Sequence, residues 1–235
     1  MNRAARIALI VSAALASVGF LALAGWQVQR LSWKLDLIER VEQRLKADPV
    51  APPAVSAEVT KADEYRRLRL SGHFEPREVL VQATTELGGG HWVIAPLRLD
   101  DGSAVLVNRG FVPPERRAPD AHATPTGPVE LIGLLRLTET GGGPLRRNEP
   151  AEGRWYSRDV AGIAAQLHLA GPVAPYFVDE SADAAQPLRY PRPGLTVVRF
   201  ANNHAVYAAT WLALAVMAAA AAFYLVREER RRAPP

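Results

Sequence analysis

Two long apolar runs, one near each end of the 235-residue chain, constrain its fold more strongly than any other feature. From Ile7 to Gly25 the only polar side chains are those of Ser12 and Ser17, and the run from Ala205 to Val226 contains no charged side chain. An α-helix rises 1.5 Å per residue, so the first run would extend about 28 Å, close to the hydrocarbon thickness of a bilayer. The sequence therefore predicts two transmembrane helices.

The first run also has features of a cleaved signal peptide, which is the alternative to a retained span. Arg3 and Arg6 give it a basic start, and Ala22 and Ala24 form the small-residue pattern of a cleavage site. Its apolar stretch is longer than a usual signal core, and a helical pattern continues beyond it. We therefore expect this segment to remain as a membrane helix.

The distribution of charge predicts which side of the membrane each part occupies. Between Gln29 and Asn203 there are 22 basic and 22 acidic residues, so the formal net charge of +4 resides in the two short tails. Basic residues in short tails stay cytoplasmic, whereas long domains cross largely regardless of charge. Five basic residues between Arg30 and Lys46 argue against this orientation, although acidic residues are mixed among them. We expect both termini in the cytoplasm and the central domain in the periplasm.

Composition excludes several classes of function. The basic excess lies in two tails rather than in a domain, which disfavours nucleic acid as a partner. The chain has no cysteine, so disulfides, zinc thiolate sites and thiol catalysis are excluded. The chain starts without the Arg- and Ser-rich leader of a mitochondrial presequence, which favours a bacterial inner membrane.

The period of the apolar pattern divides the chain into regions. It stays helical beyond the first span up to Leu45, and prolines at positions 49, 52 and 53 then end the helix. The predicted organisation is a cytoplasmic tail and first transmembrane helix at 1–28, an extracytoplasmic domain at 29–203 with a helical entry segment at 29–47, and a second transmembrane helix with a basic tail at 204–235.

From Tyr65 onwards apolar and polar side chains alternate with the period of two that is typical of β-strands. The Asp101-Gly102 turn between two such runs predicts a hairpin. A helix is expected over 157–167 with Ser157 as its N-cap, and glycine triplets at 88–90 and 141–143 are expected in loops. The fold class predicted is a membrane protein in which two transmembrane α-helices flank one antiparallel β-rich domain of the α+β kind, barrel- or sandwich-like. Strands are expected at 68–70, 79–81, 92–99, 104–107, 129–137 and 195–198.

A search for catalytic motifs finds little in this sequence. None of the five histidines has a close metal-ligand spacing, and there is no GxSxG elbow, P-loop or GxGxxG motif. A hydrolase built from distant residues, Ser103 with His73 or His91, is an alternative that nothing in the sequence favours. Arg109 is either a partner-binding arginine or one that follows a strand and pairs with a neighbouring acid.

His204 differs from the other histidines because it lies at the start of the second apolar run. Helical spacing places His204, Tyr207, Ala208 and Trp211 in one sector of that helix. In one interpretation the aromatic side chains anchor the helix at the lipid headgroups and His204 only caps it. In the other, His204 is an axial haem ligand, the rings pack on the macrocycle, and Ala208 leaves room for it.

Small residues also form stripes on both predicted spans. Ala205, Ala209 and Ala213 repeat every four residues, and the first span has a similar stripe at Ala8, Ser12, Ala16 and Gly19. Such stripes let helices approach closely. They pack the two spans together, pack against a partner protein, or reflect only the alanine-rich composition.

Short motifs follow one another in a fixed order between and within the two spans. They are Gly25-Trp26-Gln27 with Arg30, Trp33 and Lys34; Gly72-x-Phe74; Trp92-Val93-Ile94-Ala95-Pro96-Leu97; Val105-Leu106-Val107-Asn108-Arg109-Gly110-Phe111-Val112-Pro113; Gly133-Leu134-Leu135-Arg136; Asn148 before Trp155-Tyr156; and Asn202-Asn203-His204 with Tyr207-Ala208-x-Thr210-Trp211. Each is a modest signal alone. In this order they make the chain resemble the surfeit locus protein 1 family, membrane assembly factors for cytochrome c oxidase.

The resemblance implies a role in maturing the haem-copper oxidase rather than an enzymatic activity, with no catalytic residues. Bacterial members are thought to handle haem a on its way to the catalytic subunit, so haem a is the cofactor implied, held transiently. The family's haem ligand, a histidine at the outer end of the second span, matches His204, and Tyr207, Ala208 and Trp211 would surround the macrocycle. The iron's other side would be open, water-bound, or bound by a second chain.

The resemblance also implies partners, namely oxidase subunit I and a haem a synthase. Candidate contacts are Trp26, Gln27, Arg30 and Arg109. An alternative function is a cofactor-free scaffold or chaperone for oxidase subunit I. The sequence departs from the family's pattern at Ala205, Ala209 and Leu212, where bulkier residues are expected, and at His91, where the family usually has tyrosine.

Overall fold

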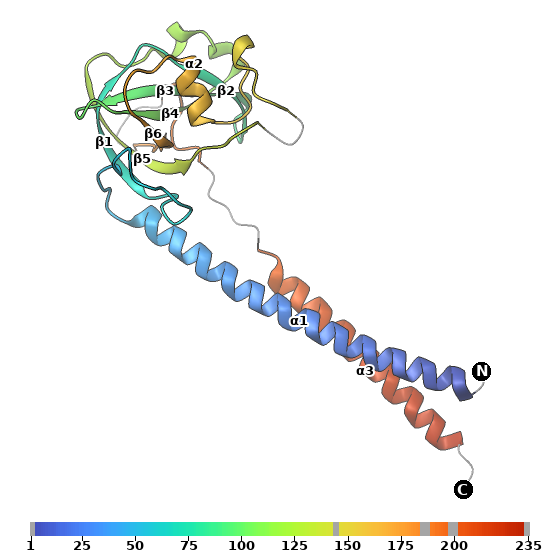
Figure 1. The fold of residues 1–235 in the computed structure, drawn as a ribbon. Coiled ribbons are helices and arrows are strands. Elements are labelled where there is room, and N and C mark those ends of the chain that lie inside the picture. The colour runs from blue at the N-terminus through green and yellow to red at the C-terminus, as the bar shows by residue number, and fades with distance from the viewer. Residues whose placement is uncertain (1–2, 143–145, 184–188, 197–201, 233–235) are drawn as a thin grey trace. The chain divides into compact units, whose positions relative to one another are not determined.

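The structure is a computed structural model that describes residues 3–142, 146–183, 189–196 and 202–232. The chain divides into two compact units (Figure 1). We call residues 1–40 together with 199–235 the helical unit, and residues 41–198 the β domain. The elements are α1 (Arg3–Lys46), β1 (Arg67–Phe74), β2 (Val79–Thr85), β3 (Gly88–Leu99), β4 (Ala104–Val112), η1 (Pro114–Arg116), η2 (Pro119–His122), β5 (Pro128–Leu137), η3 (Pro150–Glu152), α2 (Val160–Gln166), β6 (Val173–Glu180) and α3 (His204–Arg232).

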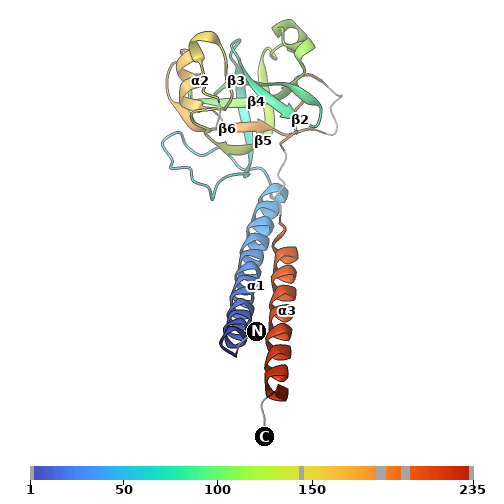
Figure 2. The same cartoon turned by 90° about the vertical axis from the view of Figure 1, so that its right-hand side faces the viewer.

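The helical unit confirms the two long apolar helices expected from the sequence. Each helix contains an apolar stretch of at least 18 residues with few charged side chains, and both are long enough to cross a bilayer. Within this unit the two helices run antiparallel and side by side (Figures 1 and 2). Ser17 Oγ donates to the carbonyl oxygen of Ala215 at 2.9 Å, and Arg6 Nε lies 2.8 Å from Glu229 Oε2.

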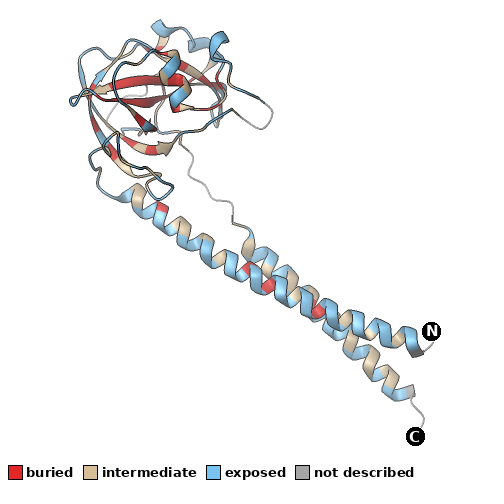
Figure 3. Ribbon diagram, viewed as in Figure 1, coloured by how far each residue is buried: buried red, intermediate tan, exposed pale blue. Residues whose placement is uncertain are grey.

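Partly or fully buried residues recur every three or four positions on one face of each helix, as at 17, 20, 24 and 27 of α1. The buried positions are Ser17, Ala24 and Gln27 on α1 and Ala215 on α3 (Figure 3). The predicted small-residue stripes at 8–19 and 205–213 are exposed on other faces of the helices. The alternative in which these stripes pack the two spans together is therefore wrong, because other positions of the two helices form the contact.

The β domain is built on one six-stranded sheet in the order β1-β5-β6-β4-β3-β2. The second half of β1 also pairs with β3, with Gly72 opposite Leu99, so five of the strands close into a barrel and β2 extends beyond it. A Cβ atom on Gly72 would lie 2.1 Å from the carbonyl oxygen of Arg98, so only glycine fits this crossing. The β-rich fold class is confirmed, although β4 and β6 pair in parallel.

Two hydrophobic clusters occupy opposite faces of the strands. Val105 and Val107 of β4 belong to one cluster, together with Tyr176 of β6. Leu106 and Phe177 belong to the other, which α2 covers through Ile163. Successive side chains of a strand point to opposite faces, and every residue of β4 is buried, so this strand is central to both clusters.

Four local expectations were wrong or incomplete. Helix α2 begins at Val160, and its N-cap is Asp159, whose Oδ1 accepts from Gly162 N, rather than Ser157. The glycines at 88–90 lie in β3 and pair with β2. Strand β6 was not expected. In the proposed late strand at 195–198, residues 195–196 do not belong to a strand, and residues 197–198 lie outside the described residues. Of the glycine triplet at 141–143, residue 143 also lies outside them.

The side chain of Glu75 binds two arginines, and one of them, Arg98, also reaches the loops at Gly102 and Ala170. Its carboxylate accepts from Arg98 Nε at 3.2 Å and from Arg77, and Arg98 also donates to the carbonyl oxygens of Gly102 and Ala170. Burial would raise the pKa of Glu75, but the hydrogen bonds from Arg98 and Arg77 outweigh it and hold the pKa below its ordinary value. A lowered pKa means that ionised Glu75 favours the folded state.

We therefore predict that Glu75→Gln lowers the free energy of unfolding by about 2 kcal/mol near neutral pH, because a charge-assisted pair is lost. Glu75 contributes its stability above its unfolded pKa of about 4.5, and the contribution disappears as the pH falls through the lower folded value. Chemical denaturation of the detergent-solubilised protein, at neutral pH and at an acid pH below the folded pKa of Glu75, measures the difference in the free energy of unfolding from wild type.

The matched control is Glu130→Gln, which breaks the exposed Arg69–Glu130 pair and should change stability by less than about 1 kcal/mol. A Glu75→Gln difference that stays the same at acid and neutral pH would contradict the assignment.

Candidate functional site

His204 is the first residue of α3 and lies at the outer end of its seam with α1. It is half-buried, and its Nδ1 lies 2.7 Å from Oε1 of Gln27. Gln27 is only 8% exposed and belongs to the same buried row of α1 as Ala24. The two residues are 177 positions apart in the sequence, so the antiparallel register of the helices brings them together.

The predicted sector of α3 divides between two environments. Ala208 and Trp211 are half-buried with His204 on the side facing α1, and the Trp211 ring stacks on Phe20 with centroids 5.6 Å apart. Tyr207 is 53% exposed and flanks this side. Trp211 therefore already has an aromatic partner within the helical unit, while Tyr207 remains open to a ligand, lipid or protein.

The chemistry of this end of the helix pair fits a haem group. A single imidazole with one ring nitrogen hydrogen-bonded is a usual axial haem ligand, and the surrounding side chains are aromatic or small and apolar. Among the described residues, no three His, Cys, Asp or Glu side chains gather as a polydentate metal site. The donor set therefore suits an iron that carries its own macrocycle better than a free metal ion.

The other partner-contact candidates on α1 point in different directions. Trp26 is 52% exposed, and the Arg30 guanidinium lies 4.6 Å from the centroid of the Trp33 ring, which is also exposed. Gln27 is turned toward α3 instead. Trp26 and Arg30 are thus available at the surface of the helical unit, whereas Gln27 acts inside it.

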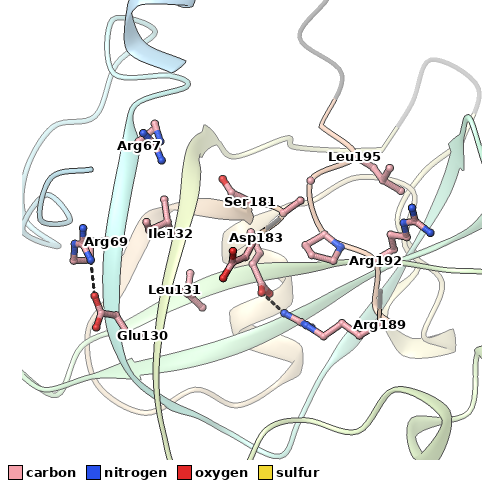
Figure 4. A pocket seen from close by; sticks show the side chains of 14 residues that line it. Arg67, Arg69, Glu130, Leu131, Ile132, Ser181, Asp183, Arg189, Arg192 and Leu195 are labelled. Carbon is pink, nitrogen blue, oxygen red and sulfur yellow. Dashed lines mark hydrogen bonds and ion pairs between the residues drawn. The ribbon is translucent and has the colours of Figure 1, made fainter. Parts of the chain in front are cut away.

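Two cavities in the described part of the β domain bear on the search for a site. The larger, of about 640 Å³, is lined by side chains from β1, β5 and the segment after β6 (Figure 4). Its charged groups are largely paired with each other: Arg69 donates to Glu130 at 2.6 Å and Arg189 pairs with Glu180. The smaller, of about 180 Å³, contains His91 and Trp155.

The geometry gives no support to a hydrolase built on Ser103. The Ser103 hydroxyl donates to Asp101 Oδ1 at 2.6 Å, within its own turn. Burial, together with the positive charge of Arg117, lowers the pKa of His91, and its Nδ1 has no hydrogen-bond partner among the described residues. Neither histidine proposed for this activity is hydrogen-bonded to Ser103 in the described structure.

Arg109 is among the most buried side chains of the described chain, with 1% of its surface exposed. Its Nη1 lies 3.7 Å from Glu78 Oε2 and donates to Thr124 Oγ1, and its Nη2 donates to the Ala123 carbonyl oxygen. Burial lowers the pKa of this guanidinium, and the attraction of Glu78 opposes that effect. The arrangement agrees with the second interpretation of Arg109, pairing with a neighbouring acid.

Two groups of functional interest were not anticipated from the sequence. One is the Gln27–His204 contact. The other is the buried pair formed by His122 and Glu78, with Nε2 and Oε1 2.7 Å apart. A glutamine within an otherwise apolar helical face is a signal that could have pointed to the first, but nothing in the sequence locates its partner.

Most of the chain is similar in sequence to proteins of one known family. The model of the SURF1 family matches residues 14–216. Surfeit locus protein 1 of Rattus norvegicus is 34% identical over 228 residues, covering 89% of this chain and 72% of the rat protein. Surfeit locus protein 1 of Homo sapiens is 35% identical over 211 residues, covering 80% and 68%. A SURF1-like protein of Monosiga brevicollis is 32% identical over 229 residues, covering 89% and 86%.

The buried position of Arg109 predicts a structural phenotype for its replacement. Arg109→Met leaves Glu78 without its cation inside the domain and should lower the free energy of unfolding by about 3 kcal/mol. Arg117→Met, at an exposed position in the next segment, should stay within about 0.5 kcal/mol of wild type. Denaturant unfolding followed by tryptophan fluorescence measures both. Wild-type stability in Arg109→Met together with lost binding to oxidase subunit I would instead favour the partner interpretation.

Proposed function

We propose that this chain, which belongs to the SURF1 family, is an assembly factor for cytochrome c oxidase that transiently holds haem a for insertion into the catalytic subunit. The observation that carries the haem proposal is the position of His204. It is the only histidine in the sequence of the helical unit, and it lies at the outer end of two helices long enough to span a bilayer. This is a carrier rather than an enzyme.

In this proposal the residues around His204 hold the group by one coordinate bond and by apolar contact. The imidazole of His204 would hold the iron through the ring nitrogen that Gln27 does not contact. Trp211, fixed against Phe20, forms a rigid wall, while Ala208 leaves space beside the ring. Tyr207 is exposed and can pack on one face of the macrocycle. When bound, haem a supplies the redox-active iron that the oxidase requires.

The location follows from the same features. We place the protein in a bacterial inner membrane with two spans, both termini in the cytoplasm and the β domain in the periplasm. The ligand site then lies at the periplasmic surface, where Trp26 and Arg30 are also exposed. Oxidase subunit I and a haem a synthase are the proposed partners at this surface.

A second candidate function is a cofactor-free scaffold for oxidase subunit I. One specific observation favours it: both His204 and Trp211 already make contacts that hold α3 against α1. A histidine used only to fasten two helices would be compatible with this function. The haem experiment below separates the two candidates.

We predict that His204→Ala abolishes haem binding while the protein still inserts into the membrane. The measurement is the absorption spectrum of detergent-purified protein from a host that makes haem a. Wild type should show a Soret band and reduced haem a features, and the variant should lack them because it has lost the axial ligand.

His73→Ala is the matched control, because His73 is exposed on β1, and it should keep the wild-type spectrum. Haem retained after His204→Ala would overturn His204 as the ligand. No haem in any of the folded proteins, with the partners supplied, would favour the scaffold.

A further inference from the structure

We infer that Gln27 is a positioning residue for His204: its side-chain carbonyl holds the imidazole as the Nδ1–H tautomer and presents Nε2 as the metal-binding nitrogen. The inference rests on the proposed function, because it names how the same site is prepared for iron. It also gives α1 a part in a site whose predicted residues, His204, Tyr207, Ala208 and Trp211, all lie on α3.

The first step of the argument is the hydrogen bond itself. Oε1 of Gln27 and Nδ1 of His204 are 2.7 Å apart, within the range of a strong hydrogen bond. A carbonyl oxygen can only accept, so Nδ1 must carry the hydrogen. A neutral imidazole has one N–H, and its lone pair therefore lies on Nε2.

The second step is that Gln27 is held in place independently of His204. It is 8% exposed and lies within the α1–α3 seam. The register of that seam is also fixed by the Ser17–Ala215 hydrogen bond, ten residues or about 15 Å away along α1, and by the stacking of Phe20 on Trp211. The carbonyl is thus directed at the ring without any contribution from a bound ligand.

The third step is the energetic consequence for a ligand. Metal-binding histidines usually donate their other N–H to a carboxylate or carbonyl group, which fixes the ring and makes the ligating nitrogen more basic. Loss of such a partner typically weakens metal binding by about 10- to 100-fold. Gln27 is buried, so water has little access to its side-chain carbonyl and replaces this bond poorly.

The test compares Gln27→Leu, which removes the acceptor, with Gln27→Glu, which keeps one. Ser17→Ala is the control, because it removes another hydrogen bond of the same seam, Ser17 to Ala215, without touching His204. The first measurement needs no haem: ¹⁵N NMR of the His204 ring in the full-length protein in detergent. We expect the Nδ1–H tautomer in wild type and Ser17→Ala, and loss of that preference in Gln27→Leu. An Nε2–H tautomer in wild type would overturn the inference.

The second measurement is titration with haem a, together with the midpoint potential of the bound haem. Gln27→Leu should bind about 10- to 100-fold more weakly. Gln27→Glu should restore affinity and lower the midpoint potential below that of wild type, because a carboxylate makes the imidazole a stronger donor. Equal weakening in Ser17→Ala and Gln27→Leu would show that the bond only fastens the helices, and would overturn the inference. If wild type shows the Nδ1–H tautomer and binds no haem, the proposed function fails while the positioning contact stands.

Discussion

The register between α1 and α3 is the constraint on which the arrangement of the candidate site depends. Lipid tails are as apolar as leucine side chains, so two helices in a bilayer gain little from the hydrophobic effect and associate through close packing and hydrogen bonds. Ser17 to Ala215 and Gln27 to His204 supply two such bonds in one seam. Each contributes about 1 kcal/mol in membranes, a modest amount, but a shift of register by one residue would break both. The position of His204 is therefore a property of the helix pair and not of α3 alone.

Side-chain hydrogen bonds and ion pairs between distant residues also connect the elements of the β domain. Asn108 and Arg109 are neighbours on β4, where the register with β3 shifts by one residue, and their side chains reach different partners. Asn108 donates to the buried carboxylate of Asp179, which also accepts from Arg136, Arg158 and Thr196. Arg109 reaches Glu78 and the segment after η2. A buried carboxylate with four donors and a buried guanidinium with carbonyl and carboxylate partners satisfy the requirement that buried charges be paired. These two motif residues thus stabilise the barrel from within.

The sequence predicted the features that depend on local pattern and missed those that depend on distant partners. Two apolar runs of membrane length and the period-two alternation around the Asp101-Gly102 turn predicted the helices and the β3–β4 hairpin correctly. Strand β6 was missed because Phe177 and Val178 are both buried, which removes the alternation on which strand recognition relies. Likewise, the sector around His204 was expected from helical spacing, but spacing within one helix does not locate Gln27 on another.

The haem-carrier role proposed above sets two opposed requirements, and different groups of the helical unit would address each of them. Retaining the macrocycle needs apolar and aromatic surface at the membrane boundary, which Tyr207 and the Trp211–Phe20 pair provide. Releasing it needs few strong bonds to the iron, and this unit has only one histidine. A histidine whose orientation is fixed beforehand would lose little entropy on binding iron. Its single bond to the iron could also be displaced by a receiving protein that offers two ligands. A histidine held by a glutamine from the facing helix would meet both requirements, because the hydrogen bond would strengthen the ligand without adding a second one to be broken.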